Sequence, residues 1–492
     1  MSDHTMYIIG VDIGTSSAKS IVRGMNGKVL AVFQQPYTTQ HPQPNYSEQD
    51  PDVILAAVKA GIREVVTQLG GTPAAISFSS AMHSLLAVSN EGVPLTPLII
   101  WADNRSESYA LALRDTPEGQ LIYRQTGTPV HAMSPLCKIM WLREQQPALF
   151  AQAALFPGIK EYIFHHFFGN YITDHSIASA TGLFDIHTLQ WCELALAAAG
   201  ITAAQLPQPV PADHIIKGLP ADMAAQLGIP ADTPFVIGGS DGCLAQLGSG
   251  AMEAGHATLT IGTSGAVRMA GLQPLTDARA RLFTYLLTDD VYITGGATNN
   301  GGVVLQWLVR DFLQKPLSAL NDLVGEALSA DPGRLLCLPY LLGERAPVWN
   351  SHASAAFIGI QPQHTPAHFT RAVLEGICFA LYSIKTALSE TAGPVRKISV
   401  SGGFTSSPGW IQLLADIFGQ DMYLQQESDA SALGAIILAA RALGWPEPDD
   451  STPATEVVFK PDVIKFEGYQ EKYRRFLKVY QQLEFLSSPG LD

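Results

Sequence analysis

Cysteine is scarce in this sequence, and its cysteines are not spaced for pairing or for metal binding. The 492 residues include five, which lie far apart and form no C-x-x-C pair: Cys137, Cys192, Cys243, Cys337 and Cys378. An odd number at such spacing fits neither a disulfide framework nor a zinc site. Because reduced thiols are typical of the cytoplasm, we expect a cytoplasmic protein.

Positive charge and long apolar runs are also lacking. Lys and Arg together number 30 against 44 Asp and Glu, which gives a net charge of −14. Nucleic acids and anionic membranes require a basic surface, so neither is expected as a partner. No apolar run reaches the ~18 residues of a membrane helix, and Asp12 interrupts the apolar run near the start, so no signal peptide is predicted. The oligomeric state stays open, with a homodimer as one alternative.

The apolar residues that are present make up 47% of the chain, which is enough for more than one large core. Single cores seldom exceed ~250–300 residues, so at least two domains are expected. Residues 7–13, 18–22 and 29–33 alternate with turn residues such as Asn26-Gly27 and predict an antiparallel meander. A helix beginning at Asp50-Pro51 and a strand over 74–80 complete an α/β domain with a mixed sheet.

An internal sequence repeat indicates that this domain is duplicated. Residues 13–16 and 261–264 both read Ile-Gly-Thr-Ser, and each segment follows a short strand-like run. Downstream of the second copy, a hairpin pattern, a helix pattern over 366–390 and a strand pattern over 397–403 repeat the first plan. We predict domains over 1–248 and 249–492, packed together around a hinge. An extension from about residue 445 is expected to end in a helix over 469–486.

The two repeated segments are candidate phosphate loops, although no Walker loop (G-x-x-x-x-G-K-S/T) occurs. A glycine after a strand lets the chain approach a ligand closely, and successive backbone N–H groups can bind an anion. The donors are Gly14, Thr15, Ser16 and Lys19 in the first loop and Gly262 and Thr263 in the second. Either loop alone is equally typical of an ordinary hairpin turn.

Asp241 is the candidate general base. It follows the apolar run over 234–239 and precedes a glycine, a position equally typical of a turn residue. Phosphoryl transfer to an alcohol needs a carboxylate that accepts the hydroxyl proton. Its place near the predicted domain boundary suits that role.

Two further segments have side chains suited to a polyol. Met82 and His83 follow another strand end, although a lone histidine is more often structural. Trp101, Asp103 and Arg105 combine an aromatic ring with hydrogen-bonding groups, which fits the C–H faces and hydroxyls of a sugar. An exposed loop is the equally common alternative for the second segment.

Together these segments resemble the FGGY carbohydrate kinases, and the resemblance extends over roughly residues 7–443. One long family signature is Met133-x-Pro135-x-x-Lys138-x-x-Trp141-Leu142. The other runs from Ala355 to Glu375. Signatures of this length are far more specific than a single glycine loop.

The resemblance implies an actin-like fold of two ribonuclease-H-like domains, with a catalytic cleft between them that binds ATP and Mg²⁺. It implies that Asp241 is the catalytic base and a candidate metal contact, and that Asp12 lies near the metal and acts through water. It also implies phosphate contacts in both loops, and sugar contacts at Met82 and His83. The implied nucleotide-contacting positions are Gly302, Gln306, Gly403 and Ser407.

Within the family, the sequence is most similar to gluconate kinases, notably over 78–84, 101–107, 158–164 and 341–350. ATP-dependent phosphorylation of D-gluconate to 6-phosphogluconate is therefore expected. Arg105 and Lys160 are the candidate partners of a substrate carboxylate, although Lys160-Glu161 is equally typical of a structural ion pair. Xylulose or another pentulose is the alternative substrate, and a non-catalytic actin-like sugar sensor is the alternative of a different class.

Overall fold

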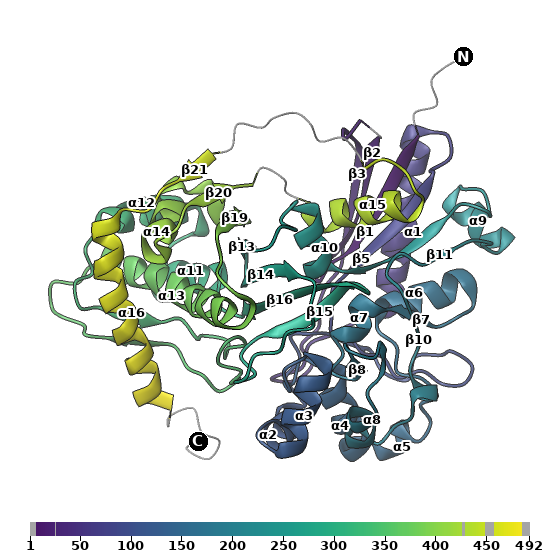
Figure 1. Ribbon diagram of the computed structural model, residues 1–492, viewed down its shortest axis with the longest axis horizontal. Coiled ribbons are helices and arrows are strands. Elements are labelled where there is room, and N and C mark those ends of the chain that lie inside the picture. The colour runs from purple at the N-terminus through teal and green to yellow at the C-terminus, as the bar shows by residue number, and fades with distance from the viewer. Residues whose placement is uncertain (1–5, 25, 426–428, 448–456, 485–492) are drawn as a thin grey trace.

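Two mixed β-sheets, one from each half of the chain, form the framework of the protein (Figure 1). The computed structural model describes residues 6–24, 26–425, 429–447 and 457–484. The first sheet has the strand order β11-β12-β5-β1-β2-β3, and the second has the order β21-β20-β19-β13-β14-β16-β15. The strands of the first sheet are β1 (Tyr7–Ile13), β2 (Ser17–Gly24), β3 (Val29–Pro36), β5 (Ala75–Ser80), β11 (Ile215–Ile216) and β12 (Phe235–Ser240). Those of the second are β13 (His256–Ile261), β14 (Gly265–Gly271), β15 (Phe283–Thr288), β16 (Val291–Thr298), β19 (Lys397–Ser401), β20 (Met422–Leu424) and β21 (Val457–Phe459).

The first sheet begins with the antiparallel meander that the sequence predicts. β1 pairs with β2 and β2 with β3, and Gly27 in the turn before β3 has a φ of 74°. Helix α1 (Pro51–Leu69) follows, and β5 then joins β1 in parallel. The carboxylate of Asp50 accepts hydrogen bonds from the amides of Asp52 and Val53, which confirms the predicted helix start.

The second sheet repeats this plan, as expected from the two Ile-Gly-Thr-Ser segments. β13 pairs antiparallel with β14 and parallel with β19, just as β1 pairs with β2 and β5. In strand order, β1, β2, β3, β5, β12 and β11 correspond to β13, β14, β16, β19, β20 and β21. β15 is an addition that forms a hairpin with β16 around Asp289-Asp290. The predicted α/β fold class is confirmed.

Helices cover the faces of both sheets. α1 packs on β2 and β3, and the long α13 (Pro366–Ala392) packs on β14 and β16. Among the described residues, α13 is the one helix long and apolar enough to cross a membrane, but 78% of its most apolar window is buried inside the protein, as in a core helix. The other helices of the second half are α11 (Gly302–Trp307), α12 (Leu320–Ser329), α14 (Pro408–Phe418) and α16 (Val463–Leu483).

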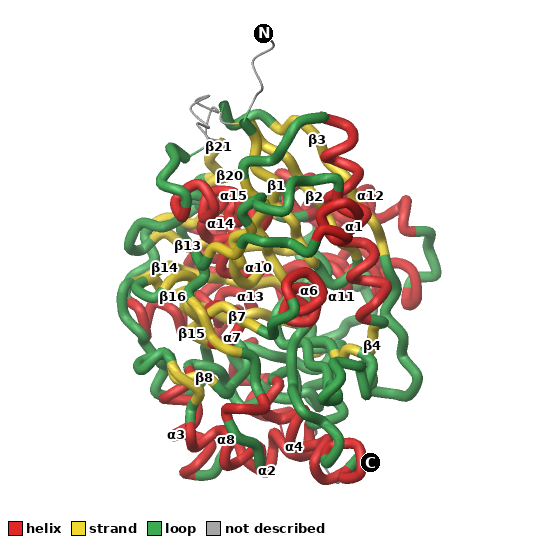
Figure 2. The backbone as a smooth tube through the Cα atoms, turned by 90° about the vertical axis from the view of Figure 1, so that its right-hand side faces the viewer, coloured by secondary structure: helices red, strands yellow, loops and turns green. Residues whose placement is uncertain are grey.

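A largely helical segment extends from the first sheet and has its own apolar core (Figure 2). Its helices are α2 (Glu107–Arg114), α3 (Pro117–Thr126), α4 (Pro135–Gln145), α5 (Pro147–Phe150) and α8 (Glu193–Ala199). Between it and the sheet lie α6 (Ile159–Phe168) and α7 (His175–Ser179), whereas α9 (Ala221–Leu227) packs on α1 beside β11. The short strand pairs are β4 (Glu48–Gln49) with β6 (Leu98–Ile99), β7 (Ile172–Asp174) with β10 (Gln208–Val210), β8 (Phe184–Asp185) with β9 (Gln190–Trp191), and β17 (Leu336–Leu338) with β18 (Ala356–Ile358).

The two halves meet where equivalent helices cross. α10 (Asp241–Gly248) follows β12, and α15 (Ala430–Ala442) follows β20, and these two helices pack directly on each other. A Cβ on Gly248 would lie 1.9 Å from the carbonyl oxygen of Ala430, and one on Gly434 would lie 2.0 Å from that of Leu244. Only glycine permits this backbone approach. α15 also packs on β1 and β5, so a helix from late in the chain completes the first half.

The C-terminal helix begins earlier than the sequence predicts. α16 spans Val463–Leu483 instead of 469–486, because Asp462 caps it by accepting hydrogen bonds from the amides of Ile464 and Lys465. Residues 485 and 486 lie outside the described residues. Tyr473 and Phe476 on α16 are buried in the core of the second half, and β21 extends its sheet.

The helix crossing generates a stability prediction. We expect Gly434→Ala to lower the melting temperature, because its methyl group must displace the α10 backbone, and such overpacking costs about 1–3 kcal/mol or more. The matched control is Gly325→Ala in α12, where a Cβ meets nothing within 4 Å. This control should raise the melting temperature slightly, since alanine favours a helix over glycine by about 1 kcal/mol. Equal shifts in a thermal denaturation scan would contradict the close crossing.

Candidate active site between the two halves

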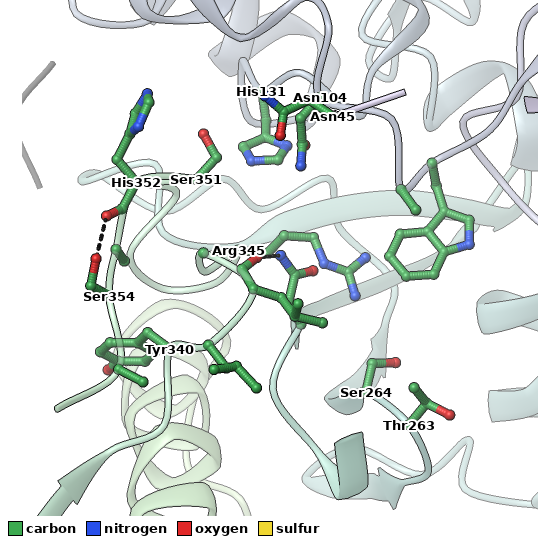
Figure 3. A pocket seen from close by; sticks show the side chains of 18 of the residues that line it. Asn45, Asn104, His131, Thr263, Ser264, Tyr340, Arg345, Ser351, His352 and Ser354 are labelled. Atoms are coloured by element: carbon green, nitrogen blue, oxygen red, sulfur yellow. Dashed lines mark hydrogen bonds between the residues drawn. The ribbon is translucent and has the colours of Figure 1, made fainter. Parts of the chain in front are cut away.

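Two adjacent cavities lie between the halves of the protein. The inner one has a volume of about 180 Å³ and is lined by residues of both halves, including Asp241 from the first and Arg268 from the second. The outer one is larger, about 860 Å³, and shares Trp101, Ser264 and Arg345 with the inner cavity. In Figure 3 the Arg345 side chain lies at the centre of the outer cavity. The inner cavity is of a size for a small sugar.

The first predicted phosphate loop reaches the inner cavity through Thr15. The Nε1–H group of Trp101 donates a hydrogen bond to Thr15 Oγ1 at 2.9 Å, and Gln49 Nε2 donates to the Thr15 carbonyl oxygen at 2.6 Å. Within the described chain, the backbone amides of Thr15 and Ser16 have no hydrogen-bond acceptor. The loop therefore has a fixed shape and two N–H groups available for an anion.

The second predicted loop lies at the opposite wall. Ser264 lines both cavities and Thr263 lines the outer one (Figure 3). The Gly302 amide at the start of α11 donates to the carbonyl oxygen of Gly262 at 2.7 Å, which fixes the loop against that helix. Among the described residues, the amides of Thr263 and Ser264 also have no acceptor. The two loops with the repeated Ile-Gly-Thr-Ser sequence, one from each half of the protein, thus both contribute residues to the inner cavity.

The other predicted nucleotide positions do not line either cavity. Gly403 follows β19 and is exposed, with open space where a Cβ would stand. Its neighbour Gly402 has a φ of 104°, and a Cβ there would lie 2.4 Å from the carbonyl oxygen of Ile261. The end of β19 therefore lies directly beside the second loop. Gln306 on α11 is exposed, and Ser407 precedes α14.

Asp241 is the first residue of α10 and faces the inner cavity. Burial and, second, the negative charge of Asp12 raise the pKa of its carboxyl group to about 6, although Arg268 and the Gly242 amide oppose the shift. The Gly242 N–H group donates to Asp241 Oδ1 at 2.7 Å. A carboxylate whose pKa lies near neutrality is suited to accept a proton from an alcohol.

Asp12 belongs to a group of charges at the crossing of α10 and α15. Its Oδ1 atom accepts a hydrogen bond from Ser79 Oγ at 2.7 Å, and burial raises the pKa of its carboxyl group. Lys19, predicted to contact a terminal phosphate, forms an ion pair with Asp429 at the start of α15. In this structure the lysine thus ties the first loop to α15. No group of three or more metal-ligating side chains occurs in the described part of the chain.

Met82 and His83 line the inner cavity as predicted. The Nδ1 atom of His83 bonds the carbonyl oxygen of Ala180 at 2.7 Å, and burial lowers the pKa of the ring to about 3. A neutral ring that donates through Nδ1 leaves Nε2 as an acceptor for a sugar hydroxyl. Lys138 Nζ donates to the carbonyl oxygens of His83 and Ile100, and so links the segment of His83 to the segment of Trp101.

Three predicted substrate-binding residues do not reach either cavity. Asp103 is fully buried and accepts hydrogen bonds from the Ser47 amide and from Arg105, whose guanidinium also pairs with Glu48. Lys160 is 1% exposed and forms an ion pair with the buried Asp174. The expectation that Arg105 or Lys160 binds a substrate carboxylate is therefore wrong, because their charges are already satisfied within the fold. Trp101 of the same segment does line both cavities.

Sequence reasoning missed three residues that line the inner cavity: Arg268 on β14, Tyr285 on β15 and Arg345 in the loop after β17. The Nε atoms of both arginines and the Tyr285 hydroxyl have no hydrogen-bond partner among the described residues. A signal for Arg268 was present, since an arginine within the apolar run GAVRMAG is unusual for a buried strand. Arg345 lies in the segment over 341–350, whose sequence indicated only a resemblance to gluconate kinases.

Two ribonuclease-H-like halves with facing hydroxyl-and-glycine loops and a buried carboxylate between them define a two-domain phosphotransferase. The comparison with known sequences agrees: the FGGY family of carbohydrate kinases matches this chain with its N-terminal domain over residues 7–248 and its C-terminal domain over 257–443. The chain belongs to this family. It is therefore an actin-like carbohydrate kinase, for which ATP is the phosphoryl donor. This result leaves the alternative of a non-catalytic sugar sensor without support.

The relatives that carry a name include gluconate kinases and xylulose kinases. A gluconokinase from Bacillus licheniformis is 40% identical over 452 residues, which cover 89% of this chain and 88% of that protein. A xylulose kinase from Staphylococcus epidermidis is 30% identical over 493 residues, with 98% of each chain covered. The crystal structure of a gluconate kinase from Lactobacillus acidophilus superimposes with a TM-score of 0.92 at 34% identity, covering 97% of this chain and 98% of that one.

The position of Asp241 predicts that its carboxylate is needed for turnover and not for folding. Asp241→Asn should lower kcat by about 10²–10⁴-fold, the range for a lost general base. ATP binding, measured by calorimetric titration, should stay within threefold of the parent protein. Asp290→Asn in the exposed β15–β16 turn is the matched control and should leave kcat unchanged. Near-normal turnover of the Asp241 variant would remove this residue from the mechanism.

The raised pKa of Asp241 predicts a pH-dependent effect on stability. The fold favours the protonated carboxyl group, so its stabilising contribution is present at low pH and is lost as the pH rises through about 6. Asp241→Asn should therefore raise the melting temperature of the ligand-free protein at pH 8, and this gain should shrink towards pH 5. A difference from the parent protein that stays constant between pH 5 and pH 8 would contradict the shift.

Proposed function

We propose that this kinase phosphorylates D-gluconate at its C6 hydroxyl to give 6-phosphogluconate. The observation that carries the proposal is the inner cavity, which combines the carboxylate of Asp241 with the guanidinium groups of Arg268 and Arg345, neither of which forms an ion pair with the described residues. A sugar acid supplies both an alcohol for the carboxylate and an anion for the arginines. The 40% identity to a gluconokinase over 89% of the chain supports the same substrate.

The side chains of the inner cavity account for the positioning of the reacting alcohol. His83 Nε2 accepts a hydrogen bond from a sugar hydroxyl, and the Trp101 ring covers part of the C–H surface. Asp241 accepts the proton of the terminal hydroxyl of the sugar. The hydroxyl oxygen then attacks the γ-phosphorus of ATP, and the bond from this phosphorus to the β,γ-bridging oxygen breaks, which releases ADP. The phosphoryl group passes between the two loops, where the free amides of Thr15, Ser16, Thr263 and Ser264 stabilise the developing charge.

The carboxylates at the base of the cleft fit a magnesium ion brought in with ATP. Mg²⁺ usually binds through one or two carboxylates, substrate phosphates and water. Asp12 and Asp241 would hold it, since the charge of Asp12 raises the pKa of the buried Asp241 carboxyl group and a cation would relieve that repulsion. When bound, the metal neutralises charge on the transferring phosphoryl group.

A cytoplasmic location follows from this function together with the thiols. All five cysteines are free and buried in the structure, and ATP and phosphorylated sugars are metabolites of the cell interior.

A pentulose such as xylulose is the second candidate substrate. The xylulose kinase relative covers 98% of this chain, and a neutral ketose would also find the Met82-His83 pair and Asp241. It would leave the two arginines unpaired, which is unfavourable for buried charges. We therefore rank it below gluconate.

The test is an ADP-release assay over a panel of D-gluconate, D-xylulose, D-ribulose and glycerol, with phosphorus NMR of the product. We expect kcat/KM for gluconate to exceed that for xylulose by at least about tenfold, and the product to carry the phosphate at C6. The scale follows from one charge-assisted hydrogen bond of about 1.5–3 kcal/mol. Turnover of xylulose without turnover of gluconate would overturn this substrate and leave the kinase assignment intact.

A further inference from the structure

The inner cavity contains two guanidinium groups that form no ion pair with the described residues. No hydrogen bond or ion pair of the Arg268 guanidinium occurs with any described residue, and its Nε atom is buried. Arg345 donates from Nη2 to the carbonyl oxygen of Thr298 at 3.2 Å, but its Nε atom has no partner and the side chain is only 9% exposed. Within the described chain, neither guanidinium has a carboxylate within ion-pair distance. Buried charge left unpaired is costly, so such a site is expected to receive an anion.

The location of Arg268 favours the sugar, more than the phosphates of ATP, as the source of this anion. Along β14, Val267 and Met269 point into the core of the second half, while Ala266 and Arg268 point to the opposite face, towards the first half. Arg268 packs against the start of α10, since a Cβ on Gly242 would lie 3.1 Å from its Nε atom. Gly262, Gly302 and Gly403 do not line the inner cavity, which combines Thr15, Ser264 and Gly265 of the two loops with Met82 and His83, the residues expected to contact the sugar.

Two neighbours complete the surroundings of the anion. The Tyr285 hydroxyl is buried without a partner, and its ring lies 5.8 Å from that of His83. The ring of Trp101 lies under the Arg345 guanidinium, whose carbon is 4.7 Å from the ring centroid. Burial lowers the pKa of Arg345 to about 10, which leaves it charged at neutral pH, and the charge of Arg268 contributes to this shift. Two like charges thus share one small space.

We propose that Arg268, supported by Arg345 and the Tyr285 hydroxyl, binds the carboxylate of the sugar-acid substrate and thereby selects acids over neutral sugars. This inference rests on the proposed function and adds to it the group that recognises the acid. A substrate carboxylate near Asp241 and Asp12 would otherwise be repelled, and the guanidinium groups offset that repulsion. The half of the protein that binds the nucleotide thus also holds the acid end of the sugar.

The test compares Arg268→Gln with Arg268→Lys and with the control Arg310→Gln, whose side chain is 60% exposed and pairs with Asp311. Assays at pH 8.5 keep Asp241 ionised in every variant, although Arg268 influences its pKa. We expect Arg268→Gln to raise KM for gluconate by about 10- to 100-fold, the range for a lost hydrogen bond to a charged group, with KM for ATP within threefold. Arg268→Lys should recover part of the loss, and Arg310→Gln should match the parent.

The parent protein is first assayed with gluconate, other six-carbon sugar acids and D-xylulose, so that the two proposals fail separately. Turnover of gluconate with an unchanged KM in Arg268→Gln would overturn this inference alone, as would an equal rise in the KM values of gluconate and ATP. Turnover of a different acid, with KM raised in the variant, would overturn gluconate as substrate and support Arg268. Turnover of xylulose alone, unaffected by Arg268→Gln, would overturn both. Melting temperatures within 3 °C of the parent are required for each comparison.

Discussion

The backbone contact between α10 and α15 is the constraint on which the site depends. Gly248 and Gly434 allow the two helices to cross closely. At each glycine, a carbonyl oxygen of the other helix occupies the space that a side chain would need. Because each helix begins at the base of the cleft, the crossing fixes the starts of both beside β1. It thereby sets Asp241 near Asp12, and places Asp429 where it pairs with Lys19 of the first loop. One steric condition between helices thus determines an electrostatic arrangement.

That arrangement is maintained at the expense of stability. Burial and the neighbouring Asp12 disfavour the ionised form of Asp241, and the guanidinium groups of Arg268 and Arg345, which form no ion pair with the described residues, are unfavourable in the ligand-free protein. Proteins commonly accept such costs where a reaction needs them. Here the unfavourable charges are of opposite sign and face one cavity, so a ligand with an alcohol at one end and an anion at the other relieves both.

Local signals in the sequence were sufficient for most of the framework. The Asn-Gly turn, the Asp50 cap and the repeated Ile-Gly-Thr-Ser segment act within a few residues, and the structure has the corresponding hairpin, helix and loops. Lys160 and Arg105 were misjudged because their partners, Asp174 and Glu48, come from other elements. The importance of Arg268 likewise depends on what is missing around it, and an unpaired charge can be recognised only once the fold is known.

The return of α15 to the first sheet also has a consequence for how the chain becomes folded. Ile8, Ala75 and Val236 of that sheet are buried by Ile436 and Ala440, which are synthesised some two hundred residues after the last strand of the sheet. During translation this apolar surface stays uncovered until nearly the whole polypeptide has left the ribosome, so the nascent chain is a natural client for chaperones. A gene fragment ending at the α10 terminus would encode a sheet with one face permanently open to aggregation.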